Sequence, residues 1–176
     1  MEKRAKRSIL ITGPESTGKS EISKALATIF KGKLLPEYAR EYLETHGSAY
    51  TSTIVEEIAK EQLKRRNALL SIADSVVFFD TDLLVCRIWM EHVYGICPDW
   101  IIKESMNPIF THILLMDIDL PWQEDPLREH PHQRKELFEK YHQALLDSGR
   151  DFSIVRGVGN ARIEHAIEIL KPIIEA

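Results

Sequence analysis

Short apolar runs alternate with helix-like patterns along this chain. Five of the runs predict buried strands, at Ser8–Thr12, Lys33–Pro36, Val76–Asp80, His112–Asp117 and Phe152–Val155. Strands that alternate with helices typically form a parallel sheet covered by those helices. The pattern therefore predicts an α/β fold.

Three stretches between and after these strands have apolar residues at helical spacing, which predicts helices whose apolar faces pack on the core. Their apolar positions are Ile22, Ala25, Leu26 and Ile29 in a helix starting near Gly18; Val55, Ile58, Ala59 and Leu63; and Ile163, Ala166, Ile167 and Leu170, with Pro172 near the helix end. The segment "TDLLVCRIWMEHVYG" is apolar nearly all round, so we expect a buried helix or one that lines a pocket.

A different composition marks Pro121–Arg134, "PWQEDPLREHPHQR". Prolines, mixed charges and a tryptophan predict an ordered loop or a lid over approximately residues 121–140. The chain has no internal repeat, low-complexity segment or linker, and its 176 residues suit one domain, 1–176.

The first strand runs directly into "GPESTGKS", which fits G-x-x-x-x-G-K-[ST] at every fixed position. In this motif the glycines let the backbone approach a phosphate, and loop amides and a helix N-terminus donate to it. Lysine bridges the β- and γ-phosphates of ATP, and the last hydroxyl coordinates Mg²⁺. We assign ATP binding to this phosphate loop, which comprises Gly13, Pro14, Glu15, Ser16, Thr17, Gly18, Lys19 and Ser20.

Together with the strand–helix alternation, the motif predicts a three-layer P-loop NTPase fold. We expect a five-stranded parallel sheet in the order 2-3-1-4-5, with helices on both faces and a lid.

Charge and composition limit the classes of partner that the chain is expected to bind. The chain has 23 Lys and Arg against 27 Asp and Glu, a net charge of −4, which argues against a general nucleic-acid binder. Lys3, Arg4, Lys6 and Arg7 are expected to form a solvated arm. Cys86 and Cys97 have neither metal-ligand nor redox spacing. No apolar stretch is long enough to span a membrane, so we expect a cytoplasmic protein.

Acidic residues at two further strand ends would complete a kinase site, because ligands of open parallel sheets lie at the carboxyl ends of the strands. Asp80 ends the third predicted strand and is assigned to Mg²⁺ with Ser20. Asp82 would face the substrate, or cap the next helix. Glu37, after the second strand, would accept the proton of the attacking hydroxyl or hold that hydroxyl in line. Tyr38 and Arg40 follow it, as substrate contacts or as a packed ring and a surface charge.

The lid offers cations and an aromatic ring. Arg128 is our choice to offset charge on the transferred phosphoryl group, and Arg134 to contact ATP, although a solvated charged loop would look the same. Trp122 and Trp89 are candidates to flank a flat heterocycle, but lone tryptophans are more often part of a core. The loop "RGVGNAR" (Arg156–Arg162) is a candidate contact for the nucleotide base.

In this order, "GPESTGKS", "EYARE" (Glu37–Glu41), "FFDTD" (Phe78–Asp82) and "PW..D..R" (Pro121–Arg128) resemble the nicotinamide riboside kinase domain of the NadR type. The resemblance implies Mg-ATP-dependent phosphorylation of the 5′-hydroxyl of nicotinamide riboside. It also places Glu37, Tyr38, Asp82, Trp122 and Asp125 around the riboside.

Two features depart from that family. Pro126 stands where many relatives have glycine, and "THGS" (Thr45–Ser48) does not fit the H-x-G-H signature of the adenylyltransferase joined to longer relatives. We therefore expect the kinase alone. Two alternatives stay open: a deoxynucleoside or other metabolite kinase, and a nucleotide-dependent regulatory ATPase. The sequence is compatible with a homo-oligomer and does not decide between ATP and GTP.

Overall fold

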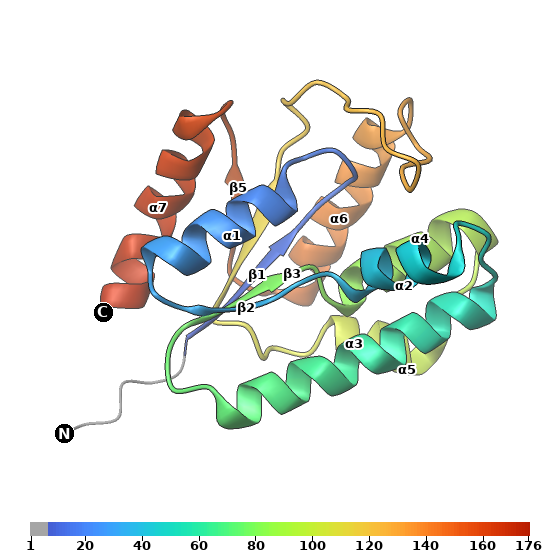
Figure 1. Cartoon of the computed structure of the whole chain (residues 1–176), viewed down its shortest axis with the longest axis horizontal. Helices are drawn as coiled ribbons and strands as arrows, with labels where there is room; N and C mark the ends of the chain where they lie inside the picture. The colour runs from blue at the N-terminus through green and yellow to red at the C-terminus, as the bar shows by residue number, and fades with distance from the viewer. Residues whose placement is uncertain (1–6) are drawn as a thin grey trace.

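Five parallel strands form the centre of the computed structural model, which describes residues 7–176 (Figure 1). The strands are β1 (Ser8–Thr12), β2 (Lys33–Leu35), β3 (Val77–Asp80), β4 (His112–Met116) and β5 (Phe152–Val155). Their order in the sheet is β2-β3-β1-β4-β5, which confirms the predicted fold class and strand order. Lys3, Arg4 and Lys6 lie outside the described residues.

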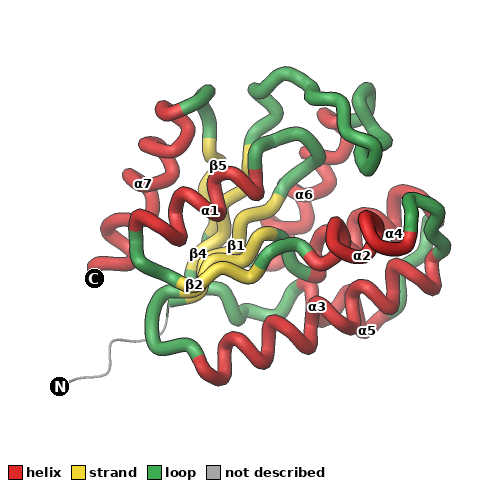
Figure 2. Tube along the Cα trace, viewed as in Figure 1, coloured by secondary structure: helices red, strands yellow, loops and turns green. Residues whose placement is uncertain are grey.

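Helices connect the strands and cover the sheet (Figure 2). They are α1 (Lys19–Ile29), α2 (Tyr38–His46), α3 (Ser52–Ile72), α4 (Leu83–Tyr94), α5 (Asp99–Ser105), α6 (Arg134–Ser148) and α7 (Asn160–Glu175). A long loop between β4 and α6 contains most of the predicted lid and runs beside the loop that follows β1 (Figure 1). The last residues of the predicted lid belong to α6 instead.

Successive side chains of a strand point to opposite faces of the sheet, so the core consists of two layers, one on each face. Ile9 and Ile11 of β1 pack with α1 and α7, while Leu10 between them packs with α4 and α6. All three are essentially inaccessible to water. A central parallel strand is buried on both faces, which explains why the strands have continuous apolar runs. A third apolar cluster joins α2, α3, α4 and α5 beside the sheet.

The structure corrects several predicted boundaries and faces. Three strands are one residue shorter than predicted, because Pro36, Val76 and Asp117 lie outside them. Ile29 is 49% exposed rather than core-facing. Pro172 lies near the end of α7, as predicted, and the helix continues to Glu175.

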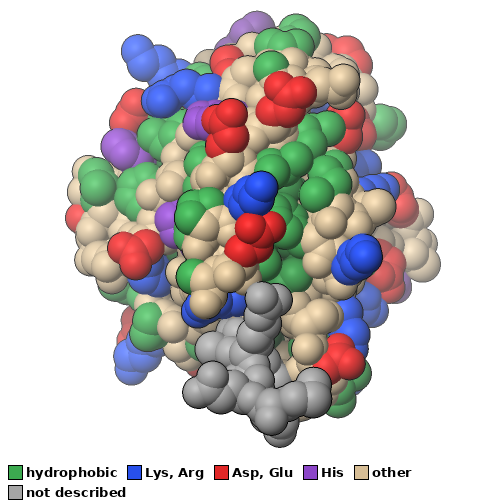
Figure 3. Space-filling model, turned by 90° about the vertical axis from the view of Figure 1, so that its left-hand side faces the viewer, with side chains coloured by type: hydrophobic (Ala, Val, Ile, Leu, Met, Phe, Trp, Pro, Cys, Tyr) green, Lys and Arg blue, Asp and Glu red, His purple; other side chains and the backbone are tan. Residues whose placement is uncertain are grey.

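On α3, the buried stripe begins as predicted with Val55, Ile58 and Ala59, but Leu63 is only half-buried. The stripe continues through the polar residues Gln62 and Arg66. At the surface, Figure 3 shows acidic and basic side chains interspersed on the side where α7 lies. No helix within residues 7–176 combines the length and the apolar character needed to cross a membrane.

Candidate functional site

The phosphate loop joins β1 to α1 at the carboxyl edge of the sheet. Gly13 has a φ of 137°, and a Cβ atom there would lie 3.0 Å from the carbonyl oxygen of Met116. Gly18 has a φ of 77° and precedes the first residue of α1. Ser16 has a φ of 56°, in the left-handed region that glycine occupies most often. Such alternating backbone conformations turn successive N–H groups toward one concave side, a shape that binds anions.

Lys19 lies inside the curve of this loop. Its ammonium group donates to the carbonyl oxygen of Pro14 at 2.7 Å, and the Thr17 hydroxyl donates to the same oxygen at 2.8 Å. Burial lowers the pKa of Lys19, while the carboxylates of Glu37 and Asp80 act in the opposite direction. These two carboxylates therefore favour the charged form of this half-buried lysine.

Asp80 and Ser20 form the candidate metal site. The Ser20 hydroxyl donates to Oδ2 of Asp80 at 2.5 Å. Oδ1 of Asp80 is buried and has no hydrogen-bond partner among the described residues. Burial raises the pKa of Asp80, and the Ser20 hydrogen bond and Lys19 oppose that rise. An unpaired carboxylate oxygen beside a hydroxyl is a donor set that suits Mg²⁺.

A cleft of about 540 Å³ extends from the phosphate loop to the region beneath the lid. Glu37 and Arg40, at the start of α2, line it, as do Trp89 and His92 of α4. Burial raises the pKa of Glu37, and attraction to Lys19 lowers it. Glu37, Arg40 and Trp89 thus line one cleft with the phosphate loop, and their predicted roles toward the substrates stay predictions.

The far half of the cleft is aromatic. The rings of Tyr50 and Trp89 meet edge to face, with centroids 4.5 Å apart. The Tyr50 hydroxyl donates to the carboxylate of Glu129 in the lid. Neither Tyr50 nor Glu129 was a sequence candidate, because Tyr50 lies in a short loop without a motif and Glu129 is one of several lid charges.

The lid contacts side chains of the phosphate loop. The Glu15 carboxylate accepts backbone N–H groups of Glu129 at 3.2 Å and His130 at 3.1 Å. The Ser16 hydroxyl accepts the N–H of Gln123 at 2.9 Å. Arg128 donates to the Gln123 carbonyl at 2.6 Å and approaches Ser16 Oγ at 3.4 Å. The predicted arginine therefore lies at the phosphate loop, fixed by the lid's own backbone.

Arg134 approaches the same loop from the first residue of α6. It donates to the carbonyl oxygens of Ser16 at 3.0 Å and Leu120 at 2.8 Å. These contacts give it a partner in the loop backbone, whereas the sequence predicted a contact with ATP.

Other sequence candidates do not line the cleft. Asp82 is buried against Arg66, whose guanidinium donates to it at 2.8 Å, and its side chain makes no capping bond to α4. Trp122 is half-buried, with an indole N–H that has no partner among the described residues. For these two residues the packing favours a structural role over the predicted substrate contact.

Two further candidates make ion-pair or cation–π contacts near the entrance. Asp125 pairs with Arg40 at 3.1 Å. The guanidinium carbon of Arg65 lies over the ring of Tyr38, 4.2 Å from the centroid of that ring. Both lie outside the cleft lining. Asp125 contacts the cleft lining through Arg40 and through Leu127, whose backbone N–H donates to its carboxylate at 2.9 Å.

A family model described as an AAA domain matches residues 8–162, which is most of the chain. The chain belongs to this AAA domain family. The AAA domain is 27% identical over 126 residues to the trifunctional NAD biosynthesis/regulator proteins NadR of Salmonella typhimurium and Escherichia coli. That match includes 69% of this chain and 31% of each relative, so the chain spans about a third of their length.

Solved structures share the fold of the AAA domain. A crystal structure of NadR protein in complex with NR matches with a TM-score of 0.82 and 21% identity, over 97% of this chain and 51% of that one. A NadR structure with NAD and AMP-PNP gives a TM-score of 0.77 at 20% identity, over 97% of this chain and 50% of that one. Deoxyadenosine kinase from M. mycoides gives 0.68 at 14% identity, over 94% of this chain and 99% of that one. These matches confirm the P-loop kinase fold, and with the sequence match they confirm the similarity to NadR.

Proposed function

We propose that this chain is a kinase that transfers the γ-phosphoryl group of ATP to the 5′-hydroxyl of nicotinamide riboside. One observation carries the proposal: a single cleft joins the phosphate loop to an aromatic pocket beneath the lid, with Glu37 in its wall. A kinase needs both substrates in one enclosed space, in line and protected from water. The similarity to NadR, including a fold shared with its NR complex, supports nicotinamide riboside as the acceptor.

The residues at the phosphate end have separable roles in this proposal. Amides of the phosphate loop and the N-terminus of α1 bind the phosphates of ATP, and Lys19 contacts the β- and γ-phosphates. Ser20 and Asp80 would hold Mg²⁺, which compensates phosphate charge. Arg128 is close enough to the loop to stabilise negative charge on the transferred group.

Glu37 is the proposed acceptor of the hydroxyl proton. As the oxygen of the acceptor forms its bond to the γ-phosphorus, the bond from that phosphorus to the β,γ-bridging oxygen breaks and ADP leaves. The proton of the hydroxyl passes to the Glu37 carboxylate. A pKa raised by burial makes this carboxylate a better base than an exposed one.

The aromatic half of the cleft suits a cationic heterocycle. Nicotinamide riboside carries a positively charged pyridinium ring, whereas the common nucleosides are neutral. Tyr50 and Trp89 provide ring faces, and Glu129 provides a carboxylate beside them. Aromatic faces and carboxylates both attract a cation, so this pocket favours the pyridinium ring.

A deoxynucleoside kinase is the second candidate. The fold match to deoxyadenosine kinase supports it, because that match includes nearly the whole of both chains. The two candidates differ in the charge of the acceptor's base and in the need for a ribose 2′-hydroxyl.

A coupled ADP assay with Mg-ATP tests the proposal. We expect turnover with nicotinamide riboside, little with adenosine or deoxyadenosine, and almost none without an acceptor. Lys19→Ala should lose activity by about 10³-fold or more and retain its circular dichroism spectrum, with Lys171→Ala at an exposed position of α7 as the matched control. Preference for deoxyadenosine would support the second candidate. Equal ADP release with no acceptor would indicate a regulatory ATPase instead.

A further inference from the structure

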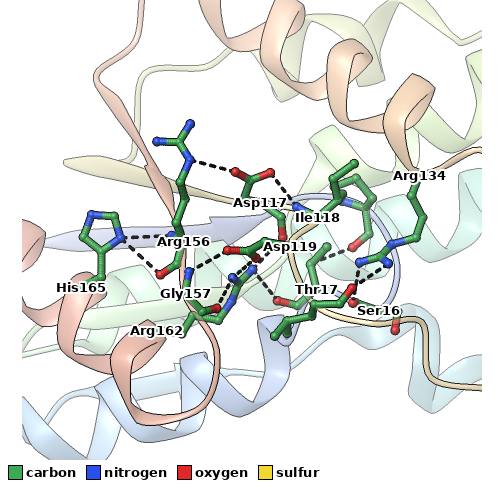
Figure 4. A network of polar contacts seen from close by, with 12 residues as sticks. Ser16, Thr17, Asp117, Ile118, Asp119, Arg134, Arg156, Gly157, Arg162 and His165 are labelled. Carbon is green, nitrogen blue, oxygen red and sulfur yellow. Dashed lines mark hydrogen bonds and ion pairs between the residues drawn. The ribbon is translucent and has the colours of Figure 1, made fainter.

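Arg162 makes a set of contacts behind the phosphate loop that the proposed chemistry does not use. It lies in the first turn of α7 (Figure 4), and it is only 2% exposed. One terminal nitrogen donates to the carbonyl oxygens of Thr17 at 3.1 Å and Asp117 at 2.7 Å. The other donates to the Asp119 carboxylate and, at 2.9 Å, to the carbonyl of Gly157. One guanidinium group thus connects the phosphate loop with the segments that follow β4 and β5.

These contacts use all the terminal hydrogens of the side chain. A guanidinium has five N–H donors, of which four are on the two terminal nitrogens. Each of the four has a protein acceptor here, and the fifth, on Nε, is buried without a partner among the described residues. Arg162 therefore has no terminal donor left for a phosphate, although it lies at the wall of the cleft.

The Thr17 contact fixes the direction of a peptide group. In an anion-binding loop the N–H groups must point toward the anion, so the carbonyl groups must point away from it. Arg162 binds the carbonyl of Thr17, whose peptide group carries the N–H of Gly18. Arg134 makes the equivalent contact with the preceding carbonyl, that of Ser16. Two arginines from different helices thus fix two successive peptide groups of the loop (Figure 4).

We propose that Arg162 is a positioning residue for phosphate binding. By holding the carbonyl oxygen of Thr17, it keeps the N–H of Gly18 in the same peptide group pointed toward the nucleotide. The inference rests on the proposed nucleotide site but not on the identity of the acceptor. Asp119 supports Arg162 and also accepts the N–H of Gly157 at 2.6 Å, so the loop after β5 is fixed by the same network. The positive charge of Arg162 is already paired with Asp119, so its effect on phosphate affinity comes through the loop geometry.

Calorimetric titration of Mg-ADP and of tripolyphosphate into the full chain tests this role. Arg162→Gln and Arg162→Lys each lose most of the four contacts, and we expect the Kd for both ligands to rise about tenfold or more. Lys171→Gln is the matched control, because Lys171 lies on the same helix, is exposed, and stands outside both the cleft lining and the loop after β5. It should change neither Kd by more than about twofold.

Several outcomes would overturn the inference. Unchanged affinities in folded Arg162 variants would make the residue purely structural. Weaker binding of ADP with unchanged binding of tripolyphosphate would assign Arg162 to the base instead. If the wild-type chain bound neither ligand, the proposed nucleotide site would fail as well, whereas a lack of riboside phosphorylation would leave this inference intact.

If the Arg162 variants do not fold, a measurement on the wild-type chain tests the proposal instead. Nuclear magnetic resonance of arginine side chains should show four distinct, slowly exchanging terminal N–H signals for Arg162. These signals should stay in place when tripolyphosphate binds, while the Gly18 amide signal moves. Averaged Arg162 signals, or signals that move as strongly as that of Gly18, would contradict a positioning role.

Discussion

Glu37 illustrates how function and stability oppose each other at a single residue. Its half-buried carboxylate lies at the wall of the cleft, beside Lys19 and near Asp80. Burial raises its pKa because the charged form loses contact with water, and only the attraction of Lys19 and Arg40 offsets part of that loss. The folded chain therefore retains a charge that the unfolded chain would solvate better.

Glu37→Gln should stabilise the chain at neutral pH and reduce its activity. A carboxyl group whose folded pKa is raised contributes stability below its unfolded pKa and loses it as the pH rises through the folded value. The variant has no charge to bury at this position. Its free energy of unfolding should therefore exceed that of wild type at pH 7, and the difference should shrink toward pH 4.5. Urea unfolding across this range measures it, with exposed Glu57→Gln as the control. We expect kcat to fall about 10²-fold. A variant that is less stable than wild type at pH 7 would contradict this account.

At the scale of elements, α3 and α4 are joined by an ion pair that no periodic pattern predicts. Arg66 continues the buried stripe of α3 and contacts Asp82 before α4 and Glu104 at the end of α5, at 2.8 and 2.7 Å. A charged residue on a helix is normally assigned to the solvent side, and its partner here is distant in sequence. Sequence patterns therefore identified the helix, but they could not reveal that Arg66 pairs with Asp82. The substrate contact predicted for Asp82 stays a prediction.

Adjacent arginines on α3 give a matched test of burial. Arg66→Met leaves Asp82 buried and unpaired, and should lower the free energy of unfolding by about 3 kcal/mol. Arg65→Met removes partly exposed pairs with Glu41 and Glu61, and should cost about 1 kcal/mol or less. Urea unfolding compares them. Adding Asp82→Leu to Arg66→Met should recover most of the loss. Should the single Asp82→Asn variant fold normally and lose acceptor affinity, the predicted substrate role of Asp82 would be right after all.

The lid is attached to the phosphate loop by hydrogen bonds to the side chains of Glu15 and Ser16. Glu15→Ala removes the acceptor for the backbone N–H groups of Glu129 and His130. We expect the lid to open more often, so that trypsin cleaves after Arg128 about tenfold faster than in wild type. Glu124→Ala, at an exposed lid residue, is the control. Equal cleavage rates in the three chains would show that Glu15 does not attach the lid.

For the molecule as a whole, the sequence predicted what depends on local pattern. Buried parallel strands read as apolar runs, and the motif from Gly13 to Ser20 determines both a loop and its position after β1, so the sheet order and the phosphate end of the cleft were predictable. The aromatic end was not. Tyr50 reaches Trp89 from a loop 39 residues earlier in the chain (89 − 50), and such a contact exists only once α2, α3 and α4 have packed.

One cleft with two halves predicts that its ligands bind cooperatively. At about 100 times its Kd, each ligand alone adds about 2.7 kcal/mol of stability, which is about 5–10 °C in Tm for a chain of this size. AMP-PNP and nicotinamide riboside together should exceed the sum of the separate shifts, because the lid contacts both Tyr50 in the aromatic half of the cleft and Glu15 and Ser16 in the phosphate loop. The first ligand therefore bears the cost of ordering the lid for the second. Thermal unfolding with each ligand and with both measures the excess, and Glu15→Ala should reduce it because the phosphate loop then loses its bonds to the lid at Glu129 and His130. Additive shifts in the wild-type chain would mean that the two halves of the cleft bind independently.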